Sequence, residues 1–562
     1  MKKLFILITL LLGFHTAWGH DAEVDGIFYN LNTEDKTANV TFQGDSYDSY
    51  KNEYSGDVVI PENVTVDGTV YAVTSLGDNC FSWCSDLTSI TIPNTVTSLG
   101  AFCFYDCSGL TTVAIPNSVT SLGNFCFYGC NGLTSITIPE TVASVGLSCF
   151  AGCNGLESIV VAAENPVYDS RDNCNAIIET STNQMIAGCK NSQIPNTVTS
   201  LGAFCFYDCS GLTTVAIPNT VTNLGDFCFY GCSGLTSIAI PETVESVGLT
   251  CFAGCSGLES IVVAAENPVY DSRENCNAII ETSTNKMIAG CKNSQIPNTV
   301  TSLGNFCFYG CSGLTTVAIP ESVTSLGNFC FEGCNGLTSI AIPNTVTILG
   351  EYCFSHCSGL TSITIPEFVT SLGDGCFSHC SSLTSIAIPE AVTSLGSNCF
   401  YNCSGLTSIT IPESVTSLGD DCFNYCSGLT SIVIPDSVKS LGDGCFKSCK
   451  AMNSITMLPP TPPTVGSSIF DDTPLMTVYV ADEEAKTLYE AETPWNEYEI
   501  VPLNTGMENI PETTGIENME TGNNATSVTG CYDLNGRRVS GKQSGPVIVR
   551  YSDGSTRKVV VK

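Results

Sequence analysis

The stretch Leu360-Thr-Ser-Ile-Thr-Ile-Pro366, continued by Val369-Thr-Ser-Leu-Gly373 and Cys376-Phe-Ser-His-Cys380, decides the fold. The spacing Leu-x-x-Ile-x-Ile predicts a short strand with its apolar side chains inward, and proline ends it because proline cannot donate a ladder hydrogen bond. The second segment is also short and extended, and its glycine suits a corner with positive φ. Cys-Phe-x-x-Cys is too short for an independent α-helix, so we expect one helical or 3₁₀ turn.

This unit recurs along most of the chain. Cys-Phe-x-x-Cys occurs fourteen times, 23 residues apart except at two places where the spacing is 56. One unit cannot enclose a core, but stacked units share one. The sequence therefore predicts a mostly β, α/β-type repeat fold: a right-handed solenoid of about 14 coils. The first cysteines of the units are Cys80, Cys103, Cys126, Cys149, Cys205, Cys228, Cys251, Cys307, Cys330, Cys353, Cys376, Cys399, Cys422 and Cys445.

The repeat resembles the BspA-like (Treponema-type) leucine-rich repeat over about residues 70 to 460. That family often has a small residue, such as alanine, before the phenylalanine, where this chain has cysteine. The resemblance implies a cell-surface binding protein, an adhesin, whose partners are protein or glycan ligands on host extracellular matrix or on other cells.

The composition and net charge disfavour two classes of binding function. With 20 Lys+Arg against 55 Asp+Glu, the net charge is −35. Nucleic-acid binding needs a basic surface, and so does attraction to anionic lipid, so both are disfavoured. Hydrophobic residues make up 43% of the chain and charged ones 13%, the profile of a chain that buries surface.

The chain divides into segments of different character. Basic Lys2 and Lys3, an apolar run and Ala17-Trp-Gly19 predict a signal peptide cleaved between Gly19 and His20, and hence an exported protein that does not span a membrane. The expected segments are the signal peptide (1–19), an N-terminal β cap (20–72), the solenoid (73–457), a proline-rich link (458–464), a C-terminal cap (465–503), a flexible linker (504–530) and a small β domain (531–562).

A block of 102 residues is duplicated. Residues 103–204 and 205–306 differ at eleven positions, and each block ends in an insertion, near 164–191 and 266–293. Each insertion reads as a β-hairpin. If the hairpins turn on Ser181-Thr182 and Ser283-Thr284, two cysteine pairs lie directly opposed and are disulfide candidates: Cys174–Cys189 and Cys276–Cys291.

The last 32 residues carry seven Lys/Arg and two Asp, a charge of +5. They resemble the C-terminal sorting domain of type IX secretion substrates, which implies passage across the outer membrane and partners in the secretion and surface-attachment machinery. The alternative is a small β module packed on the solenoid. The matching residues are Tyr532, Asp533, Gly536, Arg537, Gly545, Lys558 and Lys562.

The repeat cysteines allow three interpretations. Zinc is disfavoured because the Cys-x₃-Cys spacing comes without matching histidines. Disulfides between coils are possible by Cα spacing, but stacked Cβ atoms would remain near 4.8 Å, beyond the usual range. We favour the third, in which cysteine is a small buried apolar residue.

The candidate ligand surface is the outward side of the strands, expected to be the concave face. Its side chains are mostly hydroxyls, with no constellation of catalytic, cofactor or metal-binding type, and a tyrosine row is expected on the convex side. His356-Cys357 and His379-Cys380 read as variants of the repeat turn, so an exported enzyme is only a remote alternative and a non-binding architectural protein is the nearer one. The named candidates are Thr88, Thr91, Thr111, Thr134, Thr137, Glu157, Glu259, Thr361, Thr364, Thr407 and Thr410.

Overall fold

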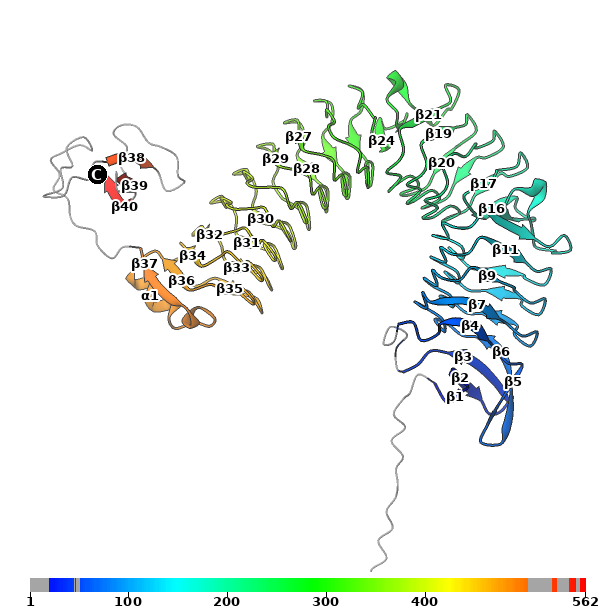
Figure 1. Cartoon of the computed structure of the whole chain (residues 1–562). Helices are drawn as coiled ribbons and strands as arrows, with labels where there is room; N and C mark the ends of the chain where they lie inside the picture. The colour runs from blue at the N-terminus through cyan, green and yellow to red at the C-terminus, as the bar shows by residue number, and fades with distance from the viewer. Residues whose placement is uncertain are drawn as a thin grey trace, which may run out of the picture. The chain divides into compact units, whose positions relative to one another are not determined.

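The structure is a computed structural model that describes residues 20–44, 46 and 51–503, and three further strands. Those strands, β38 (Val528–Tyr532), β39 (Gly545–Tyr551) and β40 (Thr556–Val561), form an antiparallel sheet. The chain divides into two compact units, residues 1–360 and 361–562. Figure 1 shows the stacked coils of the β-solenoid.

The Leu-x-x-Ile-x-Ile segments form the first kind of strand. Equivalent residues pair in parallel 23 positions apart, as Ser135 with Ser158 and Ile136 with Ile159. These strands are β7 (Leu87–Thr91), β9 (Thr112–Val113), β11 (Ser135–Ile138), β13 (Ser158–Val161), β19 (Ser237–Ile240), β21 (Ser260–Val263), β27 (Ser339–Ala341), β29 (Ser362–Thr364), β32 (Ser431–Ile434) and β34 (Ser454–Met457).

The Ser-Leu segments form the second kind, only two residues long, and also pair in parallel from coil to coil. They are β8 (Ser98–Leu99), β10 (Ser121–Leu122), β12 (Ser144–Val145), β17 (Ser200–Leu201), β18 (Asn223–Leu224), β20 (Ser246–Val247), β25 (Ser302–Leu303), β26 (Ser325–Leu326), β28 (Ile348–Leu349), β30 (Ser394–Leu395), β31 (Ser417–Leu418), β33 (Ser440–Leu441) and β35 (Thr464–Val465).

The core is a set of identical side chains stacked along the solenoid. Phe104 and Phe127 are fully buried, and their rings stack 5.1 Å apart. Cys-Phe-x-x-Cys forms a turn with 3₁₀-type bonds, such as Cys107 N–H to Phe104 O at 3.2 Å. Away from the insertions, buried rings lie on their equivalents in the next coil, so neighbouring coils share one core.

The glycine of the Ser-Leu-Gly segment has a different role from the one expected. Gly123 does not have a positive φ. An added Cβ would lie 2.4 Å from both the backbone nitrogen of Ala101 and the carbonyl carbon of Gly100 in the preceding coil. Glycine is therefore needed there for close backbone approach between coils, and the positive-φ expectation was wrong for this position.

The stack is longer than the cysteine repeat. About 14 coils were expected, and the solenoid has about 19 turns. N-terminal strands pair onto β8 through β6, and C-terminal strands continue the parallel sheet of β34. The elements concerned are β1 (Ala22–Val24), β2 (Ile27–Asn32), β3 (Thr37–Thr41), β4 (Gly56–Val59), β5 (Asn63–Val66), β6 (Thr69–Leu76), β36 (Thr477–Val480), α1 (Glu483–Tyr489), the 3₁₀ turn Trp495–Glu497 and β37 (Glu499–Pro502).

The insertions join the stack and interrupt one of its sheets. Their third strands pair in parallel with the following coil, β16 with β17 and β24 with β25, while β12 and β20 end the preceding sheets. The insertion elements are β14 (Tyr168–Asp169), the 3₁₀ turn Arg171–Asn173, β15 (Ala176–Glu179) and β16 (Gln184–Gly188), then β22 (Tyr270–Asp271), the 3₁₀ turn Arg273–Asn275, β23 (Ile279–Glu281) and β24 (Lys286–Ala289).

Each hairpin contains a bulge that changes the expected cysteine alignment. Glu179 pairs with Gln184, but beyond a register shift Ala176 pairs with Gly188. On the side of the bulge away from the hairpin turn, the extra residue shifts the pairing by one position, so Cys174 is not opposite Cys189. The second hairpin has the same shift, and Cys276 and Cys291 are likewise not opposed. All four are free thiols in the structure.

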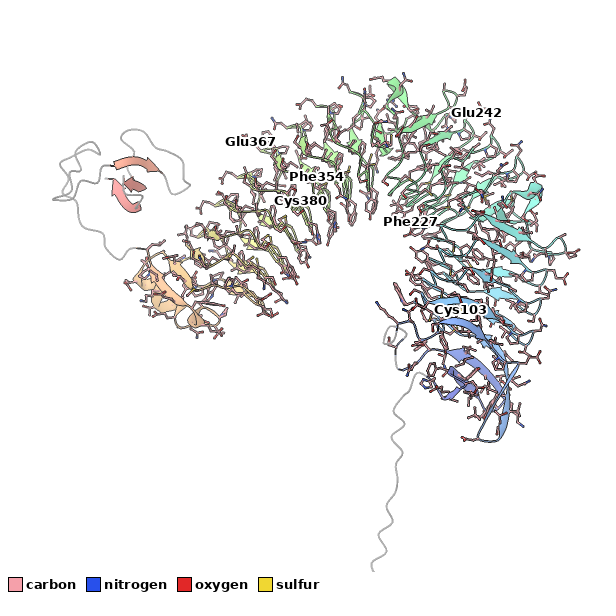
Figure 2. The ribbon with its side chains drawn as sticks, in the orientation of Figure 1. Cys103, Phe227, Glu242, Phe354, Glu367 and Cys380 are labelled. Carbon is pink, nitrogen blue, oxygen red and sulfur yellow. The ribbon has the colours of Figure 1, made fainter. Side chains whose placement is uncertain are left out.

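The first unit bends, so it has an inner and an outer edge. Within residues 20–360, Phe227 lies at the inner edge of the bend and Glu242 at the outer edge (Figure 2). Strand β19 connects these two positions, so its solvent-facing residues lie on a flank of the unit. In this unit the turn that carries Phe227 forms the inner edge, so the expectation of a concave strand face with the aromatic row on the convex side was wrong there.

Candidate functional site

All eleven candidate residues of the strand face are exposed. Alternation places Ile136 and Ile138 in the core and leaves Ser135 and Thr137 outside. The same pattern recurs in each coil, so the face is a regular array of hydroxyl and methyl groups. The exposed candidates are Thr88, Thr91, Thr111, Thr134, Thr137, Glu157 and Glu259 in the first unit, and Thr361, Thr364, Thr407 and Thr410 in the second.

Part of this face also serves the stacking of coils. The Thr111 hydroxyl donates to the Thr88 carbonyl at 3.3 Å, and Thr407 donates to Thr384 O at the same distance. The Ser-Leu side has an equivalent row, with Thr120 Oγ1 donating to Thr97 O at 3.2 Å. Sequence reasoning missed this ladder, although the 23-residue recurrence of threonine was its signal.

The two glutamates that break the pattern are paired. Glu157 forms an ion pair with Lys190 at 3.0 Å, and Glu259 with Lys292 at 2.9 Å. Both lysines belong to the segments that close the insertions. Because both glutamate side chains remain more than half exposed, these ion pairs contribute little to stability, and the carboxylates stay accessible to a ligand.

The aromatic edge is built from rings that cover one another. Tyr105 and Tyr128 stack 4.8 Å apart, and Tyr207 and Tyr230 stack 4.9 Å apart. The Tyr128 hydroxyl donates to Asp208 at 2.7 Å, and burial is the largest cause that raises the pKa of both groups. Since neighbouring rings occupy each other's faces, this edge presents ring edges and hydroxyls to solvent.

The cysteines form two buried columns with different contacts. In the first column, the sulfurs of Cys80 and Cys103 lie 3.4 Å apart. In the second, most thiols donate to a phenylalanine carbonyl of the preceding coil, as Cys130 does to Phe104 O at 3.1 Å. Burial raises the pKa of Cys403 to about 12. The expected burial is confirmed, but the hydrogen bond to the preceding coil was missed.

The two His-Cys pairs lie in the same repeated turn. The Cys357 thiol donates to Phe331 O at 3.2 Å, and Asn402 lies 3.0 Å from Nδ1 of His379. Burial lowers the pKa of His356. Across residues 20–44, 46 and 51–503, no cluster of three or more His, Cys, Asp or Glu is placed to hold a metal ion.

Other candidates fall partly outside the described residues. Gly19 and the rest of the signal segment do so, as do Asp533, Gly536, Arg537, Lys562 and the linker 504–527. Tyr532, Gly545 and Lys558 lie in strands β38, β39 and β40, respectively. No helix in the described part of the chain is both long and apolar enough to cross a membrane.

Comparison with solved structures gives several similar proteins. A leucine-rich cell surface protein from Faecalibacterium prausnitzii is 26% identical, with 73% of this chain and 93% of that chain covered and a TM-score of 0.41. A leucine-rich repeat protein from Bacteroides ovatus is 24% identical, with coverage of 86% and 100% and a TM-score of 0.33. One from Eubacterium ventriosum is 19% identical, with coverage of 81% and 94% and a TM-score of 0.42.

The family assignment rests on the repeat itself. No curated protein matches the chain. The BspA type leucine rich repeat region matches residues 50–174, 176–288, 278–396 and 370–491, which is most of the chain. Together with the stacked parallel coils, this match shows that the chain belongs to the BspA type leucine-rich repeat family.

Proposed function

We propose that this protein is a cell-surface binding protein, an adhesin that engages host extracellular-matrix proteins, glycans or other cells. The observation that carries the proposal is the exposed strand face, where every candidate threonine and glutamate is open to solvent. Membership of the BspA type family supports it.

The proposed mechanism is binding by many weak contacts. A regular face of hydroxyls and methyls offers no deep pocket, so each coil contributes a small free energy. Tandem copies then raise avidity because later contacts form at high effective concentration. The near-identical blocks 103–204 and 205–306 suit this mechanism, since duplication extends the array with few changes to its surface, such as Thr137 to Ala239.

Export and attachment are part of the same proposal. Residues 1–19 would direct export, with cleavage before His20. Residues 531–562 would act as a sorting domain recognised by secretion and surface-attachment machinery, and the matching positions include Tyr532, Gly545 and Lys558. The antiparallel arrangement of β38, β39 and β40 is compatible with a small β domain of this kind.

The test is adhesion of whole cells with and without the gene. Cells are exposed to immobilised fibronectin, fibrinogen, collagen, mucin and partner bacteria, and protease shaving measures display. We expect deletion to remove adhesion to at least one surface, and display of residues 20–503 to restore it. A variant that lacks residues 531–562 tests the sorting role. Its absence from the cell surface would support that role.

Matched variants locate the binding surface. Replacing the exposed Thr91, Thr137, Thr364 and Thr410 by Arg alters the strand face at positions outside the hydroxyl ladder. The control replaces four exposed asparagines of the proline corners by Arg, at Asn117, Asn196, Asn298 and Asn344, for the same change in charge. We expect only the first set to abolish adhesion; equal loss in both sets would contradict binding through the strand face.

The second candidate function is architectural. The threonine ladder favours it, because hydroxyls such as that of Thr111 already bond to the neighbouring coil. Unchanged adhesion after deletion of a protein shown by shaving to be displayed would favour this function over the adhesin.

A further inference from the structure

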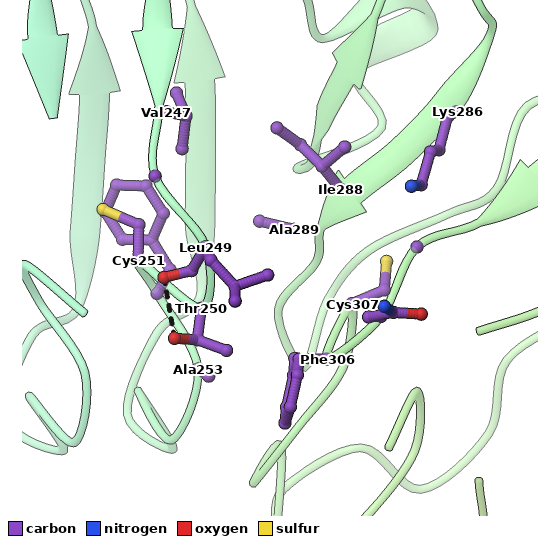
Figure 3. Close-up of a pocket in the computed structure, with 14 residues that line it drawn as sticks. Val247, Leu249, Thr250, Cys251, Ala253, Lys286, Ile288, Ala289, Phe306 and Cys307 are labelled. Carbon is purple, nitrogen blue, oxygen red and sulfur yellow. Dashed lines mark hydrogen bonds between the residues drawn. The ribbon is translucent and has the colours of Figure 1, made fainter. Parts of the chain in front are cut away.

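A cleft opens in the first unit where the second insertion interrupts the stack. Its volume is about 230 Å³, below the range of about 300–1,000 Å³ usual for drug-sized ligands, so it suits a smaller molecule. Figure 3 shows one wall formed by the coil around Leu249 and Thr250, and the other by Ile288 and Phe306.

Two rungs of the backbone ladder are missing at this cleft. In uninterrupted coils the turn donates three N–H groups to the next coil: Phe227 to Leu249 O, Phe229 to Cys251 O and Gly231 to Ala253 O, all at 2.9 Å. One coil later the donors equivalent to the first two are Thr250 and Phe252. Neither has an acceptor for its N–H in the described part of the chain, although both line the cleft.

The insertion is the cause of the missing rungs. By register, Phe252 N–H would donate to Cys307 O, but Gly290 of the insertion donates to that carbonyl at 2.7 Å. Thr250 N–H would donate to Asn305 O, which also lines the cleft. The stack resumes at the next rung, where Gly254 N–H donates to the carbonyl of the next coil at 2.8 Å. Two donors and one acceptor therefore remain at the cleft.

The remaining lining adds charge and apolar surface. Lys286 lines the cleft and forms no ion pair with any residue that the structure describes. Leu249 is 54% exposed, unusual for leucine in a solenoid whose other leucines are mostly buried. A cation and two backbone N–H donors beside apolar walls complement an anion with an apolar group attached.

We propose that this cleft binds a carboxylate carried on a carbon with an amide N–H and a small apolar side chain. The carboxylate accepts hydrogen bonds from the N–H groups of Thr250 and Phe252 and from Lys286. The ligand's amide N–H donates to Asn305 O, and its side chain contacts Leu249. Free N-acyl amino acids and the C-terminal residues of peptides share this chemistry. The site is separate from the proposed strand-face surface and does not depend on adhesion.

The first copy of the block supplies an internal control. There Gln184 replaces Lys286, and its side-chain amide donates to Ser200 at 3.3 Å. Ser148 stands in the place of Thr250, buried with no hydrogen-bond partner for its hydroxyl in the described residues. Neither Ser148 nor Phe150 has an acceptor for its N–H in the described residues, and Gly188 N–H donates to Cys205 O at 2.8 Å. The missing rungs are therefore common to both copies, whereas the cation belongs to the second alone.

The test is isothermal titration calorimetry of the full mature chain. The probes are N-acetyl-leucine and a heptapeptide ending in leucine, each also as the C-terminal amide. We expect one saturable site for at least one free acid and none for either amide. Lys286→Gln should weaken binding about tenfold or more, the loss of one charged hydrogen bond, while Gln184→Ala leaves it unchanged.

A second pair of variants separates binding from folding. Leu249→Asp should abolish binding and Leu147→Asp should not, and both leucines are more than half exposed, so both variants should fold. Binding of N-acetyl-leucine assigns the site to free acyl amino acids, and binding of the peptide alone assigns it to chain termini. The absence of saturable binding, equal binding of acid and amide, or an unaffected Lys286→Gln variant would overturn the proposal.

Discussion

At the residue scale, the second cysteine of most units acts as a hydrogen-bond donor to the preceding coil as well as an apolar side chain. Cys334 donates to Phe308 O at 3.2 Å, and both residues are fully buried. Phe308 O also accepts from the Cys311 N–H at 3.1 Å, so the thiol adds a second hydrogen bond, and this one links two coils. Burial also raises the pKa of the Cys334 thiol, because it disfavours the charged thiolate.

We predict that Cys334→Ala destabilises the protein more than Cys311→Ala. Cys311 is the control. It is the equivalent cysteine one coil earlier and is also buried, but its sulfur lies 3.8 Å from its nearest acceptor, Gly290 O, and so forms only a weak hydrogen bond. Only the first substitution removes a well-formed thiol hydrogen bond; Phe308 O keeps its bond from the Cys311 N–H at 3.1 Å, so the expected difference is about 0.5–1 kcal/mol. Urea denaturation of both variants measures it, and equal midpoints would show that the thiol is only a space-filling group.

Glu332 gives a prediction about pH. It stands at the turn position held by tyrosine in other coils, and burial raises the pKa of its carboxyl to about 7. Its Oε2 has no hydrogen-bond partner in the described residues. Because the folded pKa lies above the unfolded one, the stability contribution is complete below about pH 4.5 and is lost as pH rises through 7.

Replacing Glu332 by Gln should therefore stabilise the protein at pH 8 and have little effect at pH 4. Solvent screening of this half-buried group limits the gain to about 1 kcal/mol or less. Thermal denaturation at the two pH values tests it. A gain of equal size at both would point to a packing effect and contradict the assigned pKa.

At the element scale, the insertions show how the fold tolerates an interruption. Strand β12 ends one sheet and β20 ends the next, and a tyrosine hydroxyl from each insertion covers the exposed edge. Val145 N–H donates to Tyr168 at 3.2 Å, and Val247 N–H to Tyr270 at 3.1 Å. Such protection matters because an open strand edge invites pairing with another chain.

We predict that Tyr270→Phe speeds hydrogen exchange of the Val247 amide by about fivefold, as expected for the loss of about 1 kcal/mol of local protection. The amide of Val145, which Tyr168 covers in the first copy, is the control within the same molecule and should be unchanged. If both amides respond alike, the hydroxyl is not the group that protects the edge.

At the scale of the whole molecule, the chain is a stack with mainly nearest-neighbour contacts. Away from the insertions, parallel pairs such as Ser302 with Ser325 and Leu303 with Leu326 repeat at an offset of 23 residues. Stability is then close to a sum of coil and interface contributions, and the number of coils can change without a change of fold. The duplicated 102-residue block is consistent with such growth.

We predict that deleting one whole coil, residues 323–345, preserves the fold, because the junction Ser322–Val346 restores the repeat phase. Deleting 323–334 breaks the phase and should unfold or aggregate the protein. Circular dichroism and denaturation midpoints of both variants test this, with a loss of only about 1–3 kcal/mol expected for the whole-coil deletion. Similar damage from both deletions would contradict a modular stack.

Much of this molecule follows from its sequence alone. The 23-residue period and the Leu-x-x-Ile-x-Ile spacing were enough to predict a stacked β-solenoid and its buried residues, because a repeated local pattern admits only one way of sharing a core. The same pattern identified the exposed hydroxyl face, since alternation in a strand assigns each side chain to one side.

The rest depended on contacts between coils, which a one-dimensional pattern does not specify. Only the tertiary structure placed the aromatic turns at the inner edge of the first unit, because the direction of bending arises from small differences accumulated over many coils. The bulge between Ile177 and Ile178, which moves Cys174 out of register with Cys189, has no signal in the alternation of apolar residues. The cleft beside Lys286 exists because the N–H of Gly290 reaches a carbonyl that the interrupted stack would otherwise have used.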